Sequence, residues 1–315
     1  MRHKEELLQS RGLSAQQLSQ LTEDIKRKKE LAGLADAFVQ DRLFSVLAKN
    51  HKLAQQLLQS FHPKSAAYKQ VIKEVRAQLR RAYGLFREAE DLRQRTVLLD
   101  KIKNTSGNER EKILKEILAT SSATKERLSW YEQFWKKIFE ITNTSKYIEI
   151  TPKEKLKSKK IIDLGAGIHP FSLGLVPVKK IPPLNYFAYD LSTDEITLLQ
   201  DFFDLLHQEK NLFYGKAEVF DALQFEELRK LPKVDVALLL KMTDVLDRGK
   251  GHKVSEYVIS AVPATAVVVS FPTITMSGKE MNFPERKWIE LMCKRLSYKF
   301  EKFELGKEIF YVVKK

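Results

Sequence analysis

Apolar residues recur at helical spacing from the start of the chain to about Lys146, with few strand-like runs. In the first such stretch, Ser14 stands at an N-cap position ahead of Leu18, Leu21 and Ile25. A further helix, or a pair of helices, is indicated by Leu31, Phe38, Leu43 and Leu47. The pattern predicts an N-terminal part that is entirely helical.

The clearest helix begins after Pro63, with Ser65 as its N-cap. One face is apolar and comprises Tyr68, Val71, Ile72, Val75, Leu79, Tyr83 and Phe86. Another face is cationic and comprises Lys69, Lys73, Arg76 and Arg80, with Arg81 beside them. A cationic face either keeps a helix soluble or docks on a phosphate backbone, and we favour docking on RNA because only Glu74 interrupts the positive charges.

The segment Lys101–Asn108 is rich in Asn, Ser and Gly and predicts a loop. Helices are predicted at Arg110–Ala119 and Lys125–Ile141, and Thr142–Lys160 is predicted to connect to a second domain.

From Lys160 the pattern changes to short apolar runs that alternate with helical segments. The runs are Ile161–Leu164, Tyr186–Tyr189, Val234–Leu240 and Ala266–Phe271. Such alternation predicts a parallel sheet covered by helices. At the end, Lys299–Leu305 and Glu308–Val313 flank Gly306 and predict an antiparallel hairpin.

These elements predict an α/β fold: the Rossmann-like sheet of an S-adenosylmethionine (SAM)-dependent methyltransferase, with a terminal antiparallel hairpin and a preceding all-α domain. We expect a helical, basic domain for RNA or ribosome docking at residues 1–120. The methyltransferase domain is expected at residues 121–315, with its core at 159–315.

Charge and composition limit the classes of molecule that the protein is expected to bind. The 315-residue chain has a formal net charge of +14, and residues 1–150 carry 29 Lys and Arg against 19 Asp and Glu. Such a surface favours polyanionic partners. The single Cys293 excludes an internal disulfide and a multi-cysteine zinc site, and no metal is expected. Without a membrane-length apolar run or a secretion signal, we expect a cytoplasmic protein without membrane contact, and a monomer.

The candidate cofactor site is the strand Ile161–Leu164 and the turn Gly165-Ala166-Gly167 that follows it. Glycines allow a positive φ and a close approach of backbone to ligand. Asp190 ends the next strand, where a carboxylate can bind a ribose diol. A dinucleotide-binding fold also uses this pattern, but its third glycine is replaced here by Pro170, which favours a methyltransferase over a nicotinamide enzyme.

Several motifs of the second half occur in a characteristic order. They are Leu238-Leu239-Leu240-Lys241-Met242 with Val245-Leu246, then Val268-Val269-Ser270-Phe271-Pro272-Thr273, then Ser277-Gly278-Lys279, and, ahead of them, Thr124-Lys125-Glu126-Arg127-Leu128. In these motifs residues 60–315 resemble the aminoglycoside-resistance 16S rRNA methyltransferases of the ArmA/Rmt/FmrO type. That family methylates N7 of guanine 1405 in the decoding region of the 30S subunit.

The resemblance implies a role for each matching residue. Arg127 would hold the methionine carboxylate of SAM, Gly165 and Gly167 would line its methionine moiety, and Asp190 would bind the ribose. Glu218 stands where the family has an aspartate beside the adenine, with Asp221 as the rival candidate. Asp163, Ala166, Leu191 and Leu240 complete the expected cofactor site, Lys241 and Met242 the expected catalytic residues, and Lys279 a further RNA contact.

The implied chemistry needs little acid–base machinery, because guanine N7 already presents a lone pair. Positioning of the extracted base would then carry the rate. The segment Glu280–Pro284 departs from the family pattern in a loop that contacts RNA, so two alternatives stay open. One is methylation at a different rRNA site, and the other is a non-catalytic, ribosome-associated RNA-binding factor. The first ~60 residues have no counterpart in the family pattern, and we expect them to extend the ribosome-docking surface.

Overall fold

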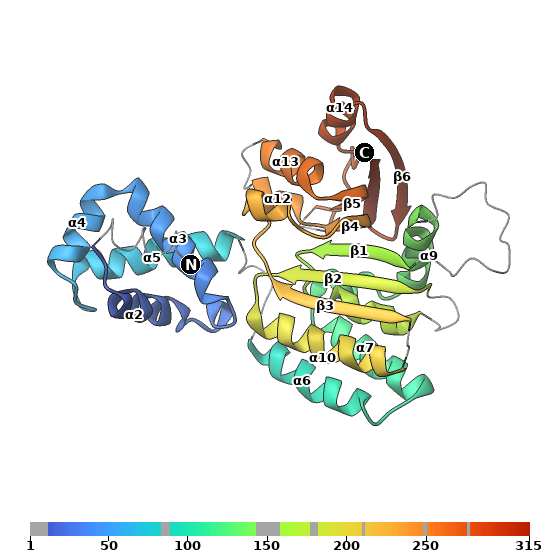
Figure 1. Cartoon of the computed structure of the whole chain (residues 1–315), viewed down its shortest axis with the longest axis horizontal. Helices are drawn as coiled ribbons and strands as arrows, with labels where there is room; N and C mark the ends of the chain where they lie inside the picture. Colours follow the sequence, from blue (N-terminus) through green and yellow to red (C-terminus); the bar gives the residue numbers. More distant parts are fainter. Residues whose placement is uncertain are drawn as a thin grey trace. The chain divides into compact units, whose positions relative to one another are not determined.

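The computed structural model describes residues 12–82, 89–142, 158–176, 182–209, 212–247, 251–275 and 278–315. The chain divides into two compact units (Figure 1). The helical unit comprises Met1–Ala89 and Leu191–Thr193, and the sheet unit comprises Glu90–Asp190 and Asp194–Lys315.

The described part of the helical unit contains α2 (Ala15–Lys26), η1 (Lys29–Leu31), α3 (Asp36–Lys49), α4 (His51–Gln59) and α5 (Ala66–Ala82). The predicted caps are confirmed: the Ser14 hydroxyl accepts from the Gln17 amide in a capping box, and the Ser65 hydroxyl accepts from the Tyr68 amide. The apolar faces of these helices form one buried cluster, which includes Leu21, Val39, Leu57, Val71 and Leu79.

The sheet unit is a seven-stranded sheet in the order β3-β2-β1-β4-β5-β7-β6. Its strands are β1 (Lys159–Leu164), β2 (Leu184–Asp190), β3 (Phe213–Val219), β4 (Val234–Leu240), β5 (Ala264–Pro272), β6 (Lys299–Leu305) and β7 (Glu308–Lys314). The pairs along β3-β2-β1-β4-β5 are parallel, whereas β7 is antiparallel to both β5 and β6. The predicted sheet and terminal hairpin are confirmed, and β3 was not predicted.

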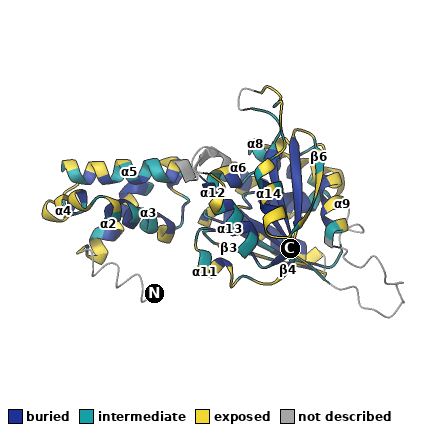
Figure 2. Ribbon diagram, turned by 90° about the horizontal axis from the view of Figure 1, so that it is seen from above, coloured by how far each residue is buried: buried dark blue, intermediate teal, exposed yellow. Residues whose placement is uncertain are grey.

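Two helical layers cover the sheet. Its central strands are largely buried, whereas the edge strands β3 and β6 carry mostly intermediate and exposed residues (Figure 2). One face packs against α6 (Ala89–Ile102), α7 (Gly107–Ala119), α9 (Tyr131–Thr142), η2 (His169–Leu175) and α10 (Thr193–Glu209). The other packs against α11 (Phe225–Leu228), α12 (Thr243–Asp247), α13 (Lys253–Ala261) and α14 (Lys287–Arg295).

The expected domain boundary at residue 120 differs from this division, because the contacts group Glu90–Thr120 with the sheet unit. The reason is packing: Leu99, Leu114 and Leu118 are buried in the same cluster as the sheet residue Tyr186. The helix predicted at Lys125–Ile141 is divided into α8 (Ser122–Lys125) and α9, which begins at Tyr131. Residues 143–157 of the predicted connector lie outside the described residues.

Beside the sheet, Trp130 and Trp135 are buried among aromatic rings that include Phe134 and His169. The Trp135 indole donates a 2.9 Å hydrogen bond to the Ser172 hydroxyl. This aromatic cluster fixes α9 against η2, which follows the glycine turn.

Candidate active site

The turn after β1 has the backbone conformation that its glycines were expected to supply. Gly165 has φ +67° and Gly167 has φ +50°, both in the left-handed region that side chains disfavour. The Ala166 amide donates to the Tyr189 carbonyl at 3.0 Å, and the Gly167 amide donates to Oδ2 of Asp190 at 3.0 Å. Asp190, the last residue of β2, is buried, and its hydrogen bond to the Gly167 amide holds the turn in place.

Met242 lies beside this turn. A Cβ built on Gly165 would meet Sδ of Met242 at 3.3 Å, tighter than ordinary contact. Met242 follows β4, whose last residue, Leu240, packs against the sheet core. Because β1 and β4 are parallel neighbours, their carboxyl ends bring the glycine turn and Met242 together.

Asp163 lies below the turn, inside the core. The Tyr186 hydroxyl donates to its Oδ2 at 2.7 Å, and Nδ1 of His169 lies 3.5 Å from the same atom. Burial raises the pKa of Asp163 to about 7, against the opposing effects of the Tyr186 hydrogen bond and the Arg127 charge. Burial also lowers the pKa of His169, which is therefore neutral at pH 7. Asp163 is therefore held within the core by Tyr186 and His169 and does not face solvent, and its assignment to the cofactor stays a prediction.

Arg127 is held by a partner that the sequence did not suggest. Its Nε and Nη2 donate to Glu308 at 3.0 and 2.7 Å, and both side chains are buried. Burial disfavours the charged form of Arg127, but the charges of Glu308, Tyr131 and Asp163 and the hydrogen bonds to Glu308 together outweigh burial and raise the pKa of the guanidinium. A two-bond pair of this kind fixes the plane of the guanidinium.

Lys241 directly follows β4 and has an unusual backbone conformation, with φ +54°. Its amide donates to the Ser270 hydroxyl at 3.0 Å, and its Nζ lies 2.6 Å from Oε2 of Glu126 and 3.8 Å from Oε2 of Glu308. Lysine rarely occupies the left-handed region, and such strain concentrates at functional sites. Lys241, Glu126, Arg127 and Glu308 form a charged cluster at the carboxyl ends of β4 and β5.

The two candidates for the adenine side differ in position. Glu218 lies within the edge strand β3, where its carboxylate is 2.8 Å from Nζ of Lys216. Asp221 lies after the strand, and its Oδ1 accepts from the Leu223 amide at 2.9 Å. The Phe220 amide between them donates to the Asp190 carbonyl at 2.9 Å. This geometry favours Asp221, which shares the carboxyl edge with Asp190.

The contacts of the other expected site residues do not connect them to the glycine turn. The contacts group Leu191 with the helical unit, so its assignment to the cofactor stays a prediction. Lys279 is exposed in a turn in which its amide and carbonyl both pair with Thr275. Ser277, Tyr83 and Phe86 lie outside the described residues, as does the side chain of Arg81.

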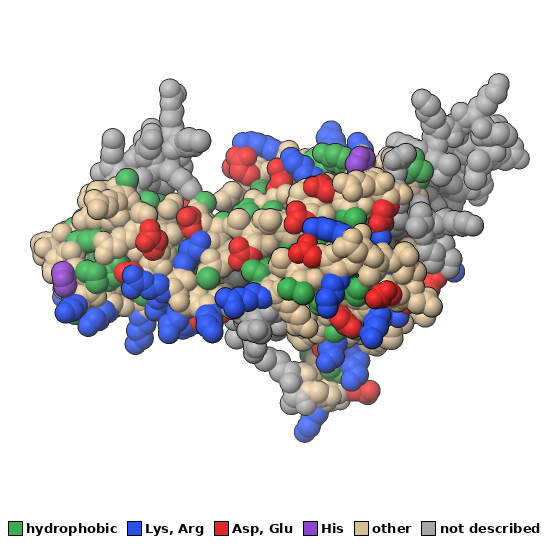
Figure 3. All heavy atoms as spheres, turned by 90° about the horizontal axis from the view of Figure 1, so that it is seen from below, with side chains coloured by type: hydrophobic (Ala, Val, Ile, Leu, Met, Phe, Trp, Pro, Cys, Tyr) green, Lys and Arg blue, Asp and Glu red, His purple; other side chains and the backbone are tan. Residues whose placement is uncertain are grey.

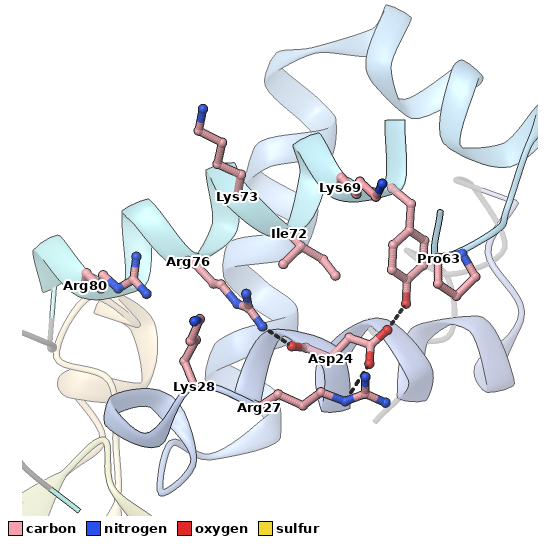
Figure 4. A pocket seen from close by; sticks show the side chains of 10 residues that line it. Asp24, Arg27, Lys28, Pro63, Lys69, Ile72, Lys73, Arg76 and Arg80 are labelled. Atoms are coloured by element: carbon pink, nitrogen blue, oxygen red, sulfur yellow. Dashed lines mark hydrogen bonds and ion pairs between the residues drawn. The ribbon is translucent and has the colours of Figure 1, made fainter. Parts of the chain in front are cut away.

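The cationic face of α5 divides into two kinds of residue. Lys69 and Lys73 are exposed. Arg76 instead donates from Nη2 to the Asp24 carbonyl at 2.5 Å and from Nε to the Ile25 carbonyl at 3.1 Å, and Arg80 pairs with Glu30 at 2.7 Å. Arg76 and Arg80 therefore also join α5 to the α2–η1 segment (Figure 4), and the assignment of the cationic face to RNA stays a prediction.

Glu308 and Glu126 are the site residues that the sequence analysis missed. A signal for Glu308 was present, since it is a carboxylate at the start of an otherwise apolar strand, which is an uncommon place for an unpaired charge. Within the described ranges, no cluster of His, Cys, Asp or Glu has the arrangement of a metal site, and no helix is long and apolar enough to cross a membrane.

Comparisons with known proteins converge on one class. A family model described as ribosomal RNA methyltransferase (FmrO) matches residues 52–312. A curated 16S rRNA (guanine(1405)-N(7))-methyltransferase from Proteus mirabilis is 24% identical over 263 residues, which cover 78% of this chain and 84% of that protein.

The solved structure of one related enzyme supports the fold. The structure of the 16S rRNA methyltransferase RmtF in complex with S-adenosyl-L-homocysteine matches with a TM-score of 0.68 and 18% identity, over 96% of this chain and 100% of that chain. The 16S rRNA methylase ArmA matches with a TM-score of 0.49 and 22% identity, over 70% of this chain and 97% of that one.

Proposed function

Because the chain belongs to the FmrO family of ribosomal RNA methyltransferases, we propose that it methylates N7 of guanine 1405 in 16S rRNA. The proposed substrate is the assembled 30S subunit in the cytoplasm, and the proposed consequence is aminoglycoside resistance. The named nucleotide comes from the Proteus mirabilis relative, which acts at that position. The chain is a SAM-dependent enzyme.

The observation that carries the proposal is the meeting of the glycine turn, Asp190, Met242 and the Lys241 cluster at one edge of the sheet. The residues there fit the cofactor: Gly165 and Gly167 leave the backbone uncovered, and Asp190 presents a carboxylate at the end of β2. SAM supplies an electrophilic methyl group when it is bound. Arg127 is the candidate for its carboxylate, and Asp221 is the candidate beside its adenine.

The protein's own contribution is positioning. No described residue needs to remove a proton, because guanine N7 is the lone-pair donor. Lys241 would grip the extracted nucleotide or its phosphates, and Met242 would border the methyl-transfer path beside Gly165. Lys279, exposed on the loop after β5, would add an RNA contact from a second side.

The test is methylation of purified 30S subunits with labelled SAM, followed by mapping of N7-methylguanine through borohydride reduction, strand cleavage and primer extension. A new stop at guanine 1405 supports the proposal. A stop elsewhere in 16S rRNA would replace the nucleotide and keep the reaction, whereas SAM binding without any methyl transfer would favour the non-catalytic factor.

A further inference from the structure

Lys and Arg side chains gather along one face of the helical unit (Figure 3), whereas the charged cluster at the carboxyl ends of β4 and β5 combines both signs of charge. The two carboxylates of this cluster differ in exposure. The side chain of Glu126 is 47% exposed, and that of Glu308 is 2% exposed. Glu126 is thus the carboxylate that a substrate can reach, and the cofactor contacts proposed for this site leave it without a role.

The backbone at Glu126 is anchored in the core on both sides. The next residue, Arg127, is buried and bonded to Glu308. Two residues earlier, Thr124 is also buried, and its hydroxyl donates to the Leu118 carbonyl. The carboxylate of Glu126 is therefore presented from a fixed piece of chain at the carboxyl edge of the sheet.

The ion pair between Glu126 and Lys241 does not explain this placement. Nζ of Lys241 lies 2.6 Å from Oε2 of Glu126, and it also lies 3.8 Å from Oε2 of the buried Glu308. An ion pair with one half-exposed partner contributes little to folding. Because Glu308 remains beside Lys241, Glu126 can turn to a ligand at little cost to the fold.

Together, the ammonium of Lys241 and the carboxylate of Glu126 place a hydrogen-bond donor beside an acceptor. Guanine presents the complementary pattern, since O6 accepts and the adjacent N1–H and N2 amino groups donate. Adenine has an amino donor in place of O6 and a lone pair at N1, so it mismatches the pair at both positions. The pair therefore suits guanine and disfavours adenine.

This arrangement also leaves N7 available for methyl transfer. On guanine, O6 lies between N1 and N7. In the protein, Lys241 is linked to Glu126 by the ion pair and to Met242 by the chain, and Sδ of Met242 lies 3.3 Å from the position of a Cβ built on Gly165. A guanine read by Glu126 and Lys241 along N1 and O6 keeps its N7 edge uncovered.

We propose that Glu126 determines the base specificity of the enzyme by accepting hydrogen bonds from N1–H and the N2 amino group of guanine, while Lys241 donates to O6. This inference rests on the proposed function, since it assumes methyl transfer to guanine. Both donors face the partner base in a duplex, so Glu126 reads them only after the base has been extracted. Glu308 is the positioning residue that holds Arg127 and lies beside Lys241.

The test is single-turnover methyl transfer to 30S subunits reconstituted with either guanine or inosine at the methylated position that mapping identifies. Inosine keeps O6, N1–H and N7 but lacks the N2 amino group. The enzymes compared are the wild type, Glu126→Ala and the control Glu227→Ala. Glu227 is matched to Glu126, because its carboxylate is also paired with a lysine near the surface, at 2.7 Å from Nζ of Lys230.

We expect the wild type and Glu227→Ala to react on the order of 10- to 100-fold more slowly with inosine than with guanine, because a hydrogen bond to a charged acceptor is lost. Glu126→Ala should be slower on guanine by a similar factor, and inosine should slow it little further, because the partner of the N2 amino group is already absent. All three enzymes should bind SAM with the same affinity.

An equal inosine effect in the wild type and Glu126→Ala would overturn the proposal, and so would a wild type that does not distinguish the two bases. Weaker SAM binding by Glu126→Ala would also overturn it, by assigning Glu126 to the cofactor. Failure of the proposed function would show differently, as no methyl transfer by the wild type to subunits that contain guanine.

Discussion

Asp163 is a buried carboxyl group whose protonation links stability to pH. Its pKa in the folded protein is about 7, above the ordinary 3.8, chiefly because of burial. The folded state therefore binds this proton more tightly than the unfolded state. The stability contribution is fully present below about pH 3.8 and is lost as the pH rises through 7.

We predict that Asp163→Asn removes this dependence, because an amide oxygen still accepts from Tyr186 but carries no charge. Wild-type stability should fall between about pH 4 and 7 relative to the variant, by up to about 1.4 kcal/mol per pH unit, and should level off above pH 7. Urea unfolding at a series of pH values measures the difference, with exposed Asp204→Asn as the control. Parallel pH profiles for wild type and Asp163→Asn would contradict the prediction.

Asp190 accepts a hydrogen bond from the Gly167 amide and is proposed to bind the cofactor ribose. Asp190→Ala should weaken SAM binding by about 1.5–3 kcal/mol while the fold stays intact, because a charge-assisted hydrogen bond is lost. Asp190→Asn retains an acceptor for the Gly167 amide and should lose less. Calorimetry with SAM decides the matter: unchanged affinity in folded Asp190→Ala would show that the ribose is bound elsewhere.

Lys241 combines a strained backbone with an expected role in catalysis. Lys241→Gly should relieve the positive φ and raise the free energy of unfolding by about 1 kcal/mol. Lys241→Ala should bring no such gain. The lost ion pair to Glu126 is half-exposed and contributes little.

Both Lys241 variants should bind 30S subunits nearly normally and transfer the methyl group much more slowly in single-turnover kinetics. A wild-type rate of methyl transfer by Lys241→Gly would show that the Lys241 side chain takes no part in catalysis.

At the scale of elements, the hairpin between β6 and β7 depends on a glycine pressed against an indole. Gly306 has φ +55°, and a Cβ there would lie 2.4 Å from Nε1 of Trp130. Gly306→Ala should destabilise the protein by about 2 to 4 kcal/mol, since it adds overpacking to backbone strain. Gly107→Ala is the matched control, because Gly107 has φ +59° with nothing near its Cβ position, and it should cost only about 1 kcal/mol. Similar losses for both variants in urea unfolding would refute the packing contribution.

Elements set by local signals could be predicted from sequence. The capping box of Ser14 and Gln17 and the apolar stripe of α5 are written within a few neighbouring residues. The edge strand β3 was missed because its exposed face carries Tyr214, Lys216 and Glu218, which interrupt the apolar pattern.

The candidate site could be predicted only in part, because only some of its residues lie close to a local sequence signal. The glycine turn and Asp190 follow consecutive strands, so the parallel-sheet rule places them together. Arg127 and Glu308 lie 181 positions apart, and only the folded sheet reveals their ion pair. The split of Lys125–Ile141 into α8 and α9 accompanies that pair, since Arg127 lies between the two helices.

At the scale of the whole molecule, a basic helical unit would be unnecessary if a short RNA hairpin were sufficient. We predict faster methylation of assembled 30S subunits than of protein-free 16S rRNA, because a folded particle presents its phosphates in fixed positions that a rigid basic surface can match. Turnover on the two substrates at equal RNA concentration tests this. Equal rates would argue against recognition of the assembled particle.

The division into two units also has an optical consequence. All three tryptophans of the chain, Trp130, Trp135 and Trp288, belong to the sheet unit. Indole fluorescence therefore reports the unfolding of that unit alone, whereas far-ultraviolet circular dichroism includes the helical unit as well. Coincident transitions from the two signals would mean that the two units melt as one cooperative block. An earlier dichroism transition would mean that the helical unit unfolds while the sheet unit is still folded.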